Sequence, residues 1–505
     1  MQYRAAGLLF FLLVAAGGMV ACSGGSSGFG AGALPPQSRA HGSPNSPIQH
    51  VIVVIQENRS FDNFFATFPG ANGTTTGLAE AMPSPVASAC AEASPPQQVI
   101  TSPTSIPLTK VTLQGDGFPG NFDANFDMAH DYLDGYLFEC DSAAKRPSST
   151  SPCKMDGFDV IHSGADGEGP PMCTYPYQYV DPRDIKPYWT MAKQYVLADD
   201  AFQTQGSESF TAHQELIAGG TADPNGITKA SIIDDPSYFP WGCDGNKSSE
   251  RTDLLTIYGQ YEGFKGPFPC LTYPNGTIRD LLDANKITWK FYANQVFSWK
   301  KGEKKAGGPG IWSAFDAISA VRYSKEWGTN VTFTDLAIFN DIKNGQLPAV
   351  SWVTPNEPNS DHPAEASDTG PSWVASIVNA IGRSKYWNSS AVVVLWDDWG
   401  GYYDHVAPPL YDNQGGLGFR FPMLIISPYV AAHVEHTQYE TTSVLRFIED
   451  NWNLGTLGQE DARATGIENA FNFKQSPRPF HRIRAKYSQA FFLHQKPSGY
   501  PPDTE

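Results

Sequence analysis

Short runs of apolar, β-branched residues recur along the chain and predict buried β-strands. Three of them are HVIVVIQ at residues 50–56, LPAVSWVTP at 347–355 and AVVVLWDD at 391–398. Two further candidates are ITWKFYANQ at 287–295 and FPMLIISPY at 421–429. Runs with so few polar positions are typical of strands that are covered on both faces, as in parallel sheets.

Segments with helical spacing of apolar residues lie between these strands. They are PYWTMAKQYVLADDAF at 187–202, the turn and helix QGSESFTAHQELIAGG at 205–220, SWVASIVNAIGRS at 372–384 and TTSVLRFIEDNWN at 441–453. Strands that alternate with helices predict an α/β protein with a doubly wound sheet covered on both faces.

The first residues have the pattern of an export signal. We interpret residues 1–21 as a signal peptide, because Arg4 precedes an apolar stretch that ends in small residues. Met19-Val20-Ala21-Cys22 resembles a bacterial lipobox, in which Cys22 is lipidated and anchors the protein to the membrane. Residues 22–47 are rich in Gly, Ser and Pro and predict a flexible tether. The expected product is exported, either as a lipoprotein of the bacterial cell envelope or in secreted form.

One large domain is expected over residues 48–480, followed by a C-terminal tail at 481–505. The Ser-, Pro-, Thr- and Gly-rich stretch at 71–120 predicts a surface insertion, and a second insertion is expected near 139–153. Six cysteines remain besides Cys22, an even number that suggests up to three disulfides in an exported chain. Proximity in the sequence favours Cys140–Cys153 and Cys243–Cys270, although other connectivities stay open.

Composition and charge narrow the range of partners. The 505 residues are 41% hydrophobic and 17% charged, which is typical of an ordered globular protein. The formal net charge of −17, without a long run of Lys or Arg, argues against nucleic acid as a partner. A small anionic substrate remains compatible with this charge, because a local cation outweighs distant negative charge.

Two predicted strands end in pairs of polar residues that can bind a cation. Glu57-Asn58 follows the first strand, and Asp397-Asp398 ends another. Ligands of open α/β sheets bind outside the carboxyl ends of the strands, and oxygen ligands suit hard divalent cations. Adjacent carboxylates repel each other without such a cation. A turn and helix cap is the alternative interpretation of Glu57-Asn58.

Ser209 is the candidate nucleophile, because a turn delivers it to the start of a predicted helix. The start of a helix favours anions such as phosphate, and a metal ion can activate a serine without a histidine base. An ordinary serine helix cap is the alternative. The G-x-S-x-G motif of α/β-hydrolases is absent, since Ser209 is followed by Phe210-Thr211 and not by x-Gly.

Three histidines lie in polar stretches where they could act on a phosphoryl group. They are His130 in DMAHDY, His362 in NSDHPAE and His405 in YYDHVAPP. A histidine at such a site binds phosphoryl oxygens or protonates the leaving alkoxide. A surface location is the alternative for each of them, and His405 could instead be held by Asp404 as a structural pair.

Several of these stretches, taken in their order along the chain, resemble the bacterial phosphoesterase family that includes phospholipases C and AcpA-type acid phosphatases. The resemblance extends from about residue 48 to about residue 480. The stretches that carry it include QHVIVVIQENRSFDNFFATFPG, KMDGF, SFTAHQELIAG, SDHP, DDWGGYYDHVAPP and GLGFRFPMLIISPY.

The resemblance implies a three-layer α/β/α sandwich with a mostly parallel central sheet, as in alkaline phosphatases. It also implies metal-dependent hydrolysis of a phosphoric ester through a phosphoserine intermediate. Position by position, one divalent ion would be held by Glu57, Asn58, Asp397, Asp398 and Ser209, with Ser209 as nucleophile. His130 and His362 match histidines that line the phosphate pocket. Ca²⁺, Mg²⁺, Mn²⁺ and Zn²⁺ all remain candidates.

The substrate is the least determined part of this interpretation. A phospholipase C-like enzyme acting on phospholipids is the first expectation, and an acid phosphatase acting on phosphomonoesters is the main alternative. A serine carboxylesterase and a noncatalytic surface lipoprotein are further alternatives. Phosphatase-like members carry additional histidines before S-[DE]-H-P, whereas this chain has none between His213 and His362. Lys300 is a candidate substitute.

Overall fold

The computed structural model describes residues 46–114, 127–164, 167, 169–222, 231–236, 241–256, 261–294, 310–363, 367–409 and 416–496. The predicted signal peptide, Cys22, most of the tether and Lys300 lie outside these residues. Within them, no helix combines the length and apolar character that crossing a bilayer requires.

An eight-stranded sheet forms the centre of the fold, with the strand order β12-β11-β13-β1-β14-β15-β6-β16. Its strands are β1 (His50–Gln56), β6 (Val196–Ala198), β11 (Trp289–Tyr292), β12 (Val331–Thr332), β13 (Val350–Val353), β14 (Ser390–Trp396), β15 (Met423–Ile426) and β16 (His433–Glu435). Only β15 runs antiparallel to its neighbours. The apolar runs predicted as strands therefore occupy the middle of the sheet, where β14 is buried along its whole length.

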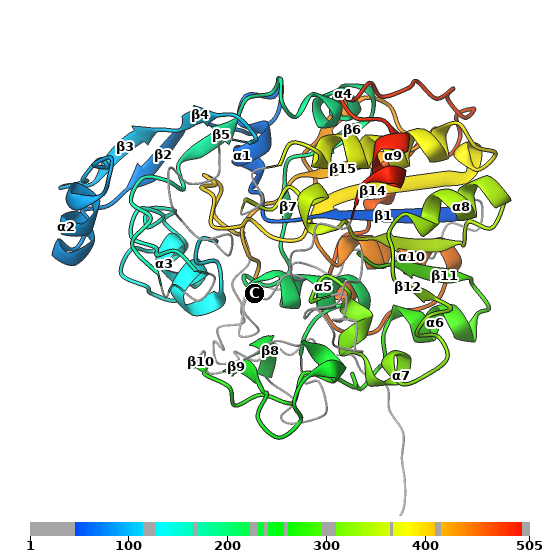
Figure 1. The fold of residues 1–505 in the computed structure, drawn as a ribbon, viewed down its shortest axis with the longest axis horizontal. Helices are drawn as coiled ribbons and strands as arrows, with labels where there is room; N and C mark the ends of the chain where they lie inside the picture. The colour runs from blue at the N-terminus through cyan, green and yellow to red at the C-terminus, as the bar shows by residue number, and fades with distance from the viewer. Residues whose placement is uncertain are drawn as a thin grey trace, which may run out of the picture. The chain divides into compact units, whose positions relative to one another are not determined.

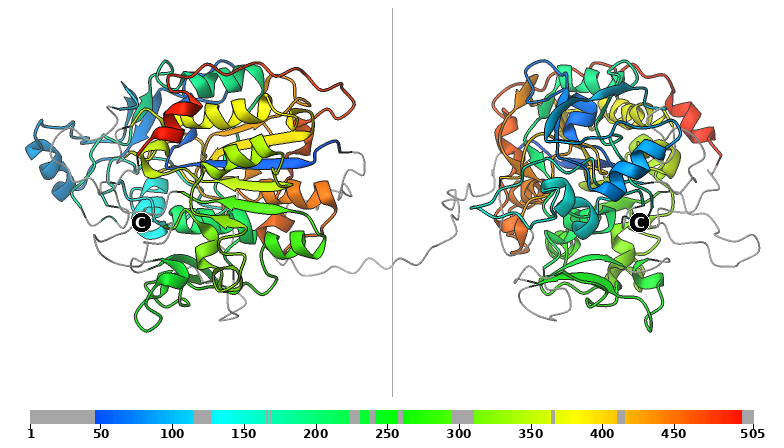
Figure 2. Two further views of the ribbon diagram at one scale, coloured as in Figure 1. Left: turned by 45° about the vertical axis from the view of Figure 1, so that its right-hand side comes forward. Right: turned by 90° about the vertical axis from the view of Figure 1, so that its left-hand side faces the viewer.

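Helices cover the sheet on both sides, and Figure 2 shows α9 and α11 to one side of the strands and α10 to the other. The helices are α1 (Phe61–Phe65), α2 (Ser84–Glu92), α3 (Leu137–Cys140), α4 (Lys186–Gln194), α5 (Ser209–Ala218), α6 (Ile278–Ala284), α7 (Ser319–Arg322), α8 (Ala337–Asn344), α9 (Gly370–Gly382), α10 (Ser443–Trp452) and α11 (Gln489–His494). The predicted three-layer α/β class with a mostly parallel sheet is confirmed (Figure 1).

The helix predicted over 187–202 was too long. The helix α4 ends at Gln194, Tyr195 is extended, and Val196–Ala198 forms β6 between β15 and β16. Ala201–Phe202 then forms the short strand β7, which pairs with β17 (Tyr439–Glu440). A strand of three residues shows too little alternation to be separated from a preceding helix, and its pairing with distant strands overrides local periodicity.

The segment predicted as a surface insertion packs as a second, smaller cluster beside the ends of β1 and β14. It contains α2, a hairpin of β2 (Thr76–Ala79) with β3 (Thr104–Pro107), and β4 (Thr109–Val111), which pairs with β5 (Gln178–Val180). Buried residues of this cluster, such as Ile106 and Phe158, pack together with Trp399, which directly follows Asp398. The insertion therefore supports the chain immediately after β14.

Three disulfides join the described cysteines. The two predicted pairs, Cys140–Cys153 and Cys243–Cys270, are confirmed. The third, Cys90–Cys173, spans 83 residues and ties the insertion to the chain before β5. Such a set is typical of an oxidising compartment. A three-stranded sheet of β8 (Ser231–Pro236), β9 (Thr252–Thr256) and β10 (Tyr261–Glu262) forms a further small unit (Figure 1).

One buried carboxyl group beside α9 makes the stability of the fold depend on pH. Trp373 in α9 donates its Nε1–H to Oδ2 of Asp335 at 2.7 Å. Burial raises the pKa of Asp335 from 3.8 to about 7, although the bond from Trp373 works in the opposite direction. The folded protein therefore binds one more proton than the unfolded chain at pH values between these two.

We expect this carboxyl group to destabilise the protein as the pH rises. Its contribution is fully favourable below about pH 4 and falls by on the order of 4 kcal/mol as the pH rises past 7. Asp335→Asn should flatten that slope and raise Tm at pH 8 more than at pH 5, measured by calorimetry. Asp283→Asn is the control, because exposed Asp283 accepts a similar bond from Trp289 at 2.9 Å. An unchanged slope in Asp335→Asn would show that the folded protein holds this group ionised.

Candidate active site

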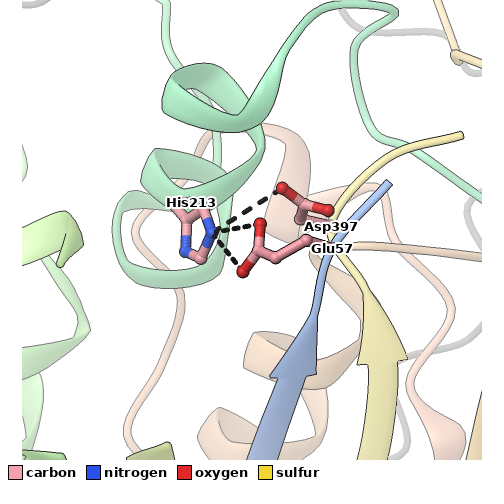
Figure 3. A group of neighbouring side chains, drawn as sticks. All are labelled: Glu57, His213 and Asp397. Atoms are coloured by element: carbon pink, nitrogen blue, oxygen red, sulfur yellow. Dashed lines mark hydrogen bonds and ion pairs between the residues drawn. The ribbon is translucent and has the colours of Figure 1, made fainter. Parts of the chain in front are cut away.

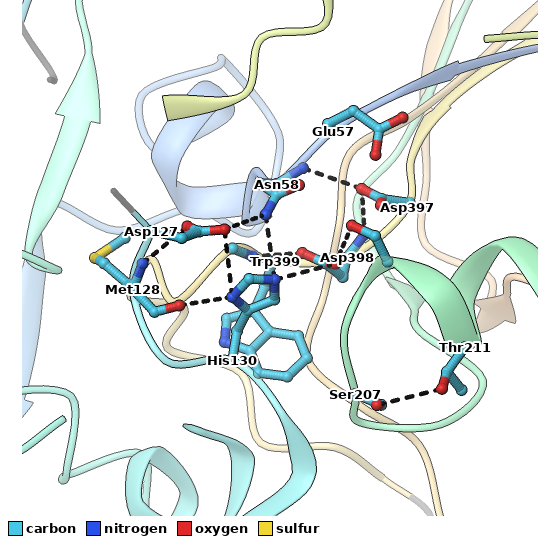
Figure 4. Close-up of polar contacts among 12 residues, drawn as sticks. Glu57, Asn58, Asp127, Met128, His130, Ser207, Thr211, Asp397, Asp398 and Trp399 are labelled. Carbon is cyan, nitrogen blue, oxygen red and sulfur yellow. Dashed lines mark hydrogen bonds and ion pairs between the residues drawn. The ribbon is translucent and has the colours of Figure 1, made fainter. Parts of the chain in front are cut away.

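The pairing of β1 with β14 brings two polar pairs together. The strands run parallel in a register that matches His50 with Ser390 and Gln56 with Trp396. Glu57-Asn58 and Asp397-Asp398 are the next residues on each strand, and all four are completely buried. The Asp397 backbone N–H donates to the Gln56 carbonyl at 2.9 Å, so the pairing continues past the strand ends. The structure thus places four of the five sequence-predicted metal ligands at one edge of the sheet (Figure 4).

Asn58 lies in a strained turn that fixes the direction of its side chain. Its φ of 58° is in the left-handed region, which asparagine tolerates better than most residues. Gly400 passes so close that a Cβ there would lie 2.6 Å from the Asn58 Cβ. The Asn58 Nδ2 donates to Asp127 Oδ2 at 3.2 Å, and its backbone N–H donates to Asp397 Oδ1 at 3.0 Å. Its Oδ1 is buried without a hydrogen-bond partner among the described residues.

A histidine from α5 completes a group that could hold a metal ion. The Nε2 atom of His213 lies 3.3 Å from both carboxylate oxygens of Glu57 and 3.7 Å from Asp397 Oδ2 (Figure 3). One ligand atom from each of the three residues lies within 4.8 Å of the other two. Burial lowers the pKa of His213 to about 4, against the charge of Asp397, so its imidazole is neutral at physiological pH. A neutral imidazole and two carboxylates are suitable ligands for a divalent cation.

The negative charge of Asp397 and Asp398 is not balanced by a lysine or arginine of the described residues. Burial and the neighbouring Asp397 and Asp127 raise the pKa of Asp398 well above its usual range. No lysine or arginine among the described residues forms an ion pair with Asp397 or Asp398. The unpartnered Asn58 Oδ1 and these carboxylates are the oxygen donors that a divalent cation would satisfy.

Ser209 is the first residue of α5 and faces the carboxylates. Its Oγ donates to Asp398 Oδ2 at 3.4 Å, and the residue is almost completely buried. Its alternative interpretation as the helix cap is wrong, because Glu208 occupies the cap position. Ser207, two residues earlier, instead bonds to Asp234 and lies 3.1 Å from Asp235 Oδ2. The two serines therefore contact different carboxylates.

The two predicted pocket histidines converge on a fourth carboxylate, that of Asp127. Asp127 Oδ2 lies 3.3 Å from His362 Nε2 and 3.8 Å from His130 Nδ1. The Nδ1 of His130 is 2.6 Å from the carbonyl of Met128, so this nitrogen carries the proton. Its Nε2 then faces Asn58 Nδ2 at 3.2 Å and Asp398 Oδ2 at 3.6 Å (Figure 4).

The loop that carries His362 is held in place by a residue that follows β1. Arg59 follows Asn58, and its guanidinium donates to the carbonyl of Asp361 at 2.8 Å from Nε. The side chain of Asp361 accepts from the hydroxyl of Tyr188 in α4 at 2.6 Å. His362 is thus positioned by residues of two separate elements.

Sequence reasoning did not include Asp127 or His213 in the site. Asp127 precedes His130 by three residues, and this spacing was a usable signal. His213 follows Ser209 by four residues, which places both on one face of a helix. Lys300, the candidate substitute for the absent histidines, lies outside the described residues.

The interpretation of His405 as a partner of Asp404 is wrong. Its Nδ1 bonds to Asp62 Oδ2 at 2.6 Å, whereas Asp404 accepts two bonds from buried Arg420 at 2.9 and 3.0 Å. Asp62, Asp404 and His405 also have ligand atoms close enough to hold a cation. Here Arg420 supplies the positive charge, so this group connects α1 to the chain after β14.

An α/β sheet with buried carboxylates, histidines and a serine at the carboxyl edge of its strands defines the site of a hydrolytic enzyme. Residues 48–455 match the Phosphoesterase family, and the chain belongs to this family. It is therefore a hydrolase that acts on phosphoester bonds, which removes the carboxylesterase and noncatalytic alternatives.

Phospholipases C are among the relatives. Phospholipase C B of Mycobacterium tuberculosis is 24% identical, over 86% of this chain and 79% of its own length. Non-hemolytic phospholipase C of Pseudomonas aeruginosa is 24% identical, over 83% of this chain and 56% of its own. Among solved structures, an alkaline phosphatase superfamily protein from Vibrio parahaemolyticus aligns at 12% identity with a TM-score of 0.30, covering 56% of this chain and 65% of its own.

Removing Arg420 should destabilise the protein strongly. Arg420→Met leaves Asp404 and Asp62 buried without their cation, which costs about 3–5 kcal/mol in comparable pairs. The free energy of unfolding from urea titration measures this loss. Arg446→Met is the matched control, since its bond to Asp450 at 2.6 Å is near the surface and should cost about 1 kcal/mol or less. Equal losses in both variants would contradict a structural role for Arg420.

Proposed function

We propose that this protein is a phospholipase C-like phosphodiesterase that uses one divalent metal ion and a phosphoserine intermediate. The observation that carries the proposal is the meeting of Ser209 with the carboxylates at the ends of β1 and β14. The names of the relatives support phospholipids as the substrate class. Hydrolysis of a phosphomonoester by the same residues is the alternative that the experiments below distinguish.

The residues present fit a divalent cation. Glu57, Asn58, Asp397 and Asp398 would hold it together with Ser209, and when bound it would polarise a phosphoryl oxygen and lower the pKa of the Ser209 hydroxyl. His213 lies close enough to Glu57 and Asp397 to be a further ligand. Its nitrogen favours Mn²⁺ or Zn²⁺ over Ca²⁺ or Mg²⁺.

The side chains of the site have distinct tasks in this mechanism. Ser209 loses its proton, for which Asp398 is an acceptor at 3.4 Å, and attacks the phosphorus in line with the leaving alcohol. His362 then protonates that alcohol, and Asp127 beside its Nε2 supports the protonated imidazole. His130 presents Nε2 toward the metal ligands, and when protonated on both ring nitrogens it would donate from Nε2 to a phosphoryl oxygen. Water finally hydrolyses the phosphoserine.

We further propose export of the chain through its leader, with Cys22 as the site of a lipid anchor. The three disulfides support an oxidising compartment.

Chelation tests the metal and the substrate class together. We expect the protein to hydrolyse p-nitrophenylphosphorylcholine faster than p-nitrophenyl phosphate, to lose activity with a chelator and to regain it with one added metal. Elemental analysis of the same sample identifies the ion. Faster hydrolysis of the monoester would instead make the protein a phosphatase. Full activity in a sample shown to be free of metal would rule out the metal-dependent mechanism.

Two serine variants identify the nucleophile. Ser209→Ala should lower kcat by about 10³-fold or more, because the attacking oxygen is gone. Ser207→Ala is the matched control, since it removes a buried hydroxyl two residues away and should retain most activity. Circular dichroism and Tm establish that both variants fold. If Ser207→Ala has no activity while Ser209→Ala hydrolyses the substrate with a normal kcat, Ser209 is not the nucleophile.

A further inference from the structure

The C-terminal segment at 481–496 packs against α9. Asn379 in α9 exchanges two hydrogen bonds with the backbone of Ile483, each 2.9 Å long. The Tyr487 backbone N–H donates to Ser372 Oγ at 3.2 Å, and Phe492 in α11 is completely buried. The exposed side chains of this segment are therefore held in fixed places on the surface.

This segment is basic in an otherwise acidic chain. Residues 481–496 contain four Lys and Arg and no Asp or Glu, although the net charge of the whole chain is −17. Arg482, Arg484 and Lys486 are exposed. A local surplus of positive charge on an acidic protein indicates a surface with a particular anionic partner.

Arg484 and Lys486 border a surface pocket of about 330 Å³ together with Arg183 and Lys186. We call these four cations, with Asp184 and Asp368, the basic pocket. Lys486 pairs with Asp368, and Arg183 pairs with Asp181 at 2.6 Å. Lys186 and Arg484 have no carboxylate within ion-pair distance among the described residues. The pocket therefore keeps a positive surplus.

The basic pocket lies at the same edge of the sheet as the candidate active site. The helix α9, whose first turn contains Ser372, follows β13 and so begins near the carboxyl end of that strand. The helix α4 begins with Lys186 and leads into β6, which runs in the same direction as β14. Tyr188 in α4 bonds to Asp361, the residue before His362. A flat partner bound at the pocket would therefore lie along the catalytic edge.

Apolar side chains continue the pocket outward. Phe491 and Leu493 are 39% and 46% exposed, and both belong to the short helix α11. Tyr487 stacks on Phe491 with ring centroids 4.6 Å apart, and its hydroxyl bonds to Asp368 of the pocket at 2.9 Å. Cations and exposed aromatic residues thus form one continuous surface.

We propose that the basic pocket and α11 form a docking surface for an anionic phospholipid bilayer. Cations attract anionic headgroups, while adjacent apolar side chains enter the boundary of the acyl chains. The distant negative charge of the protein does not cancel this attraction, because the Debye length is about 8 Å at physiological ionic strength. The binding itself is independent of the proposed function, but its benefit for lipid hydrolysis rests on that function.

Vesicle cosedimentation tests the proposal with the chain from Ser23 onward, which lacks the leader and Cys22. Ser209→Ala serves as the host so that no vesicle is hydrolysed. We expect binding to phosphatidylcholine vesicles that contain phosphatidylserine, weaker binding without it, and a decline with added salt. Lys186→Gln/Arg484→Gln/Lys486→Gln should lower affinity on the order of 100-fold, since each basic residue contributes about fivefold near an anionic surface. Phe491→Ala should also weaken binding.

A control variant with the same change of net charge distinguishes the loss of this surface from a general effect of the lower positive charge on vesicle binding. Lys286→Gln/Lys325→Gln/Lys343→Gln removes three exposed lysines elsewhere on the protein and should bind like the host. Equal losses in the two triple variants, or equal binding to both kinds of vesicle, would overturn the proposal. Competition by soluble glycerophosphate would also overturn it and would assign the pocket to small anions. In the Ser209-containing protein, the pocket triple variant should hydrolyse p-nitrophenylphosphorylcholine normally, so failure of docking and failure of the proposed chemistry are distinguishable.

Discussion

The parallel register of β1 and β14 is the constraint on which the rest of the site depends. These strands have hardly any polar side chain facing the core, so their position is fixed by hydrogen bonding and burial together. A slip by one residue would move Asp397 away from Asn58 and would turn every buried side chain to the opposite face. The register therefore places candidate oxygen ligands from distant parts of the chain side by side. The same edge receives Ser209 and His213 from α5.

Two groups of buried carboxylates and histidines lie near this edge, and the negative charge of their carboxylates is compensated in different ways. Asp62, Asp404 and His405 surround the guanidinium of Arg420, so the protein carries its own cation there. Glu57, His213 and Asp397 have the same kinds of side chain, but no arginine or lysine of the described chain pairs with Asp397 or its neighbour Asp398. Burial of uncompensated carboxylates is costly. The contrast supports a structural role for the first group and a ligand-binding role for the second.

Much of this arrangement was predictable from the sequence. Apolar runs located β1, β13, β14 and β15, and the polar pairs after β1 and β14 indicated where ligands would gather. Local sequence patterns failed to predict elements whose structure depends on long-range strand pairing. An example is β6, which follows α4 without a turn motif. They also failed for single side chains whose role depends on contacts far along the chain. The bond of His405 to Asp62 joins residues 343 positions apart, and its adjacent Asp404 was the misleading local partner.

The site also depends on parts of the chain that contain none of its catalytic candidates. Asp361 is held by Arg59 after β1 and by Tyr188 in α4, so the direction of His362 follows from two other segments at once. The amide of Asn359, in the same loop, donates to Gln495 Oε1 at 2.9 Å, just after α11. The C-terminal segment therefore touches the loop of His362 at one end and the basic pocket at the other. If a bilayer binds this segment, the contact between Gln495 and Asn359 connects the lipid-bound surface to the loop that carries His362.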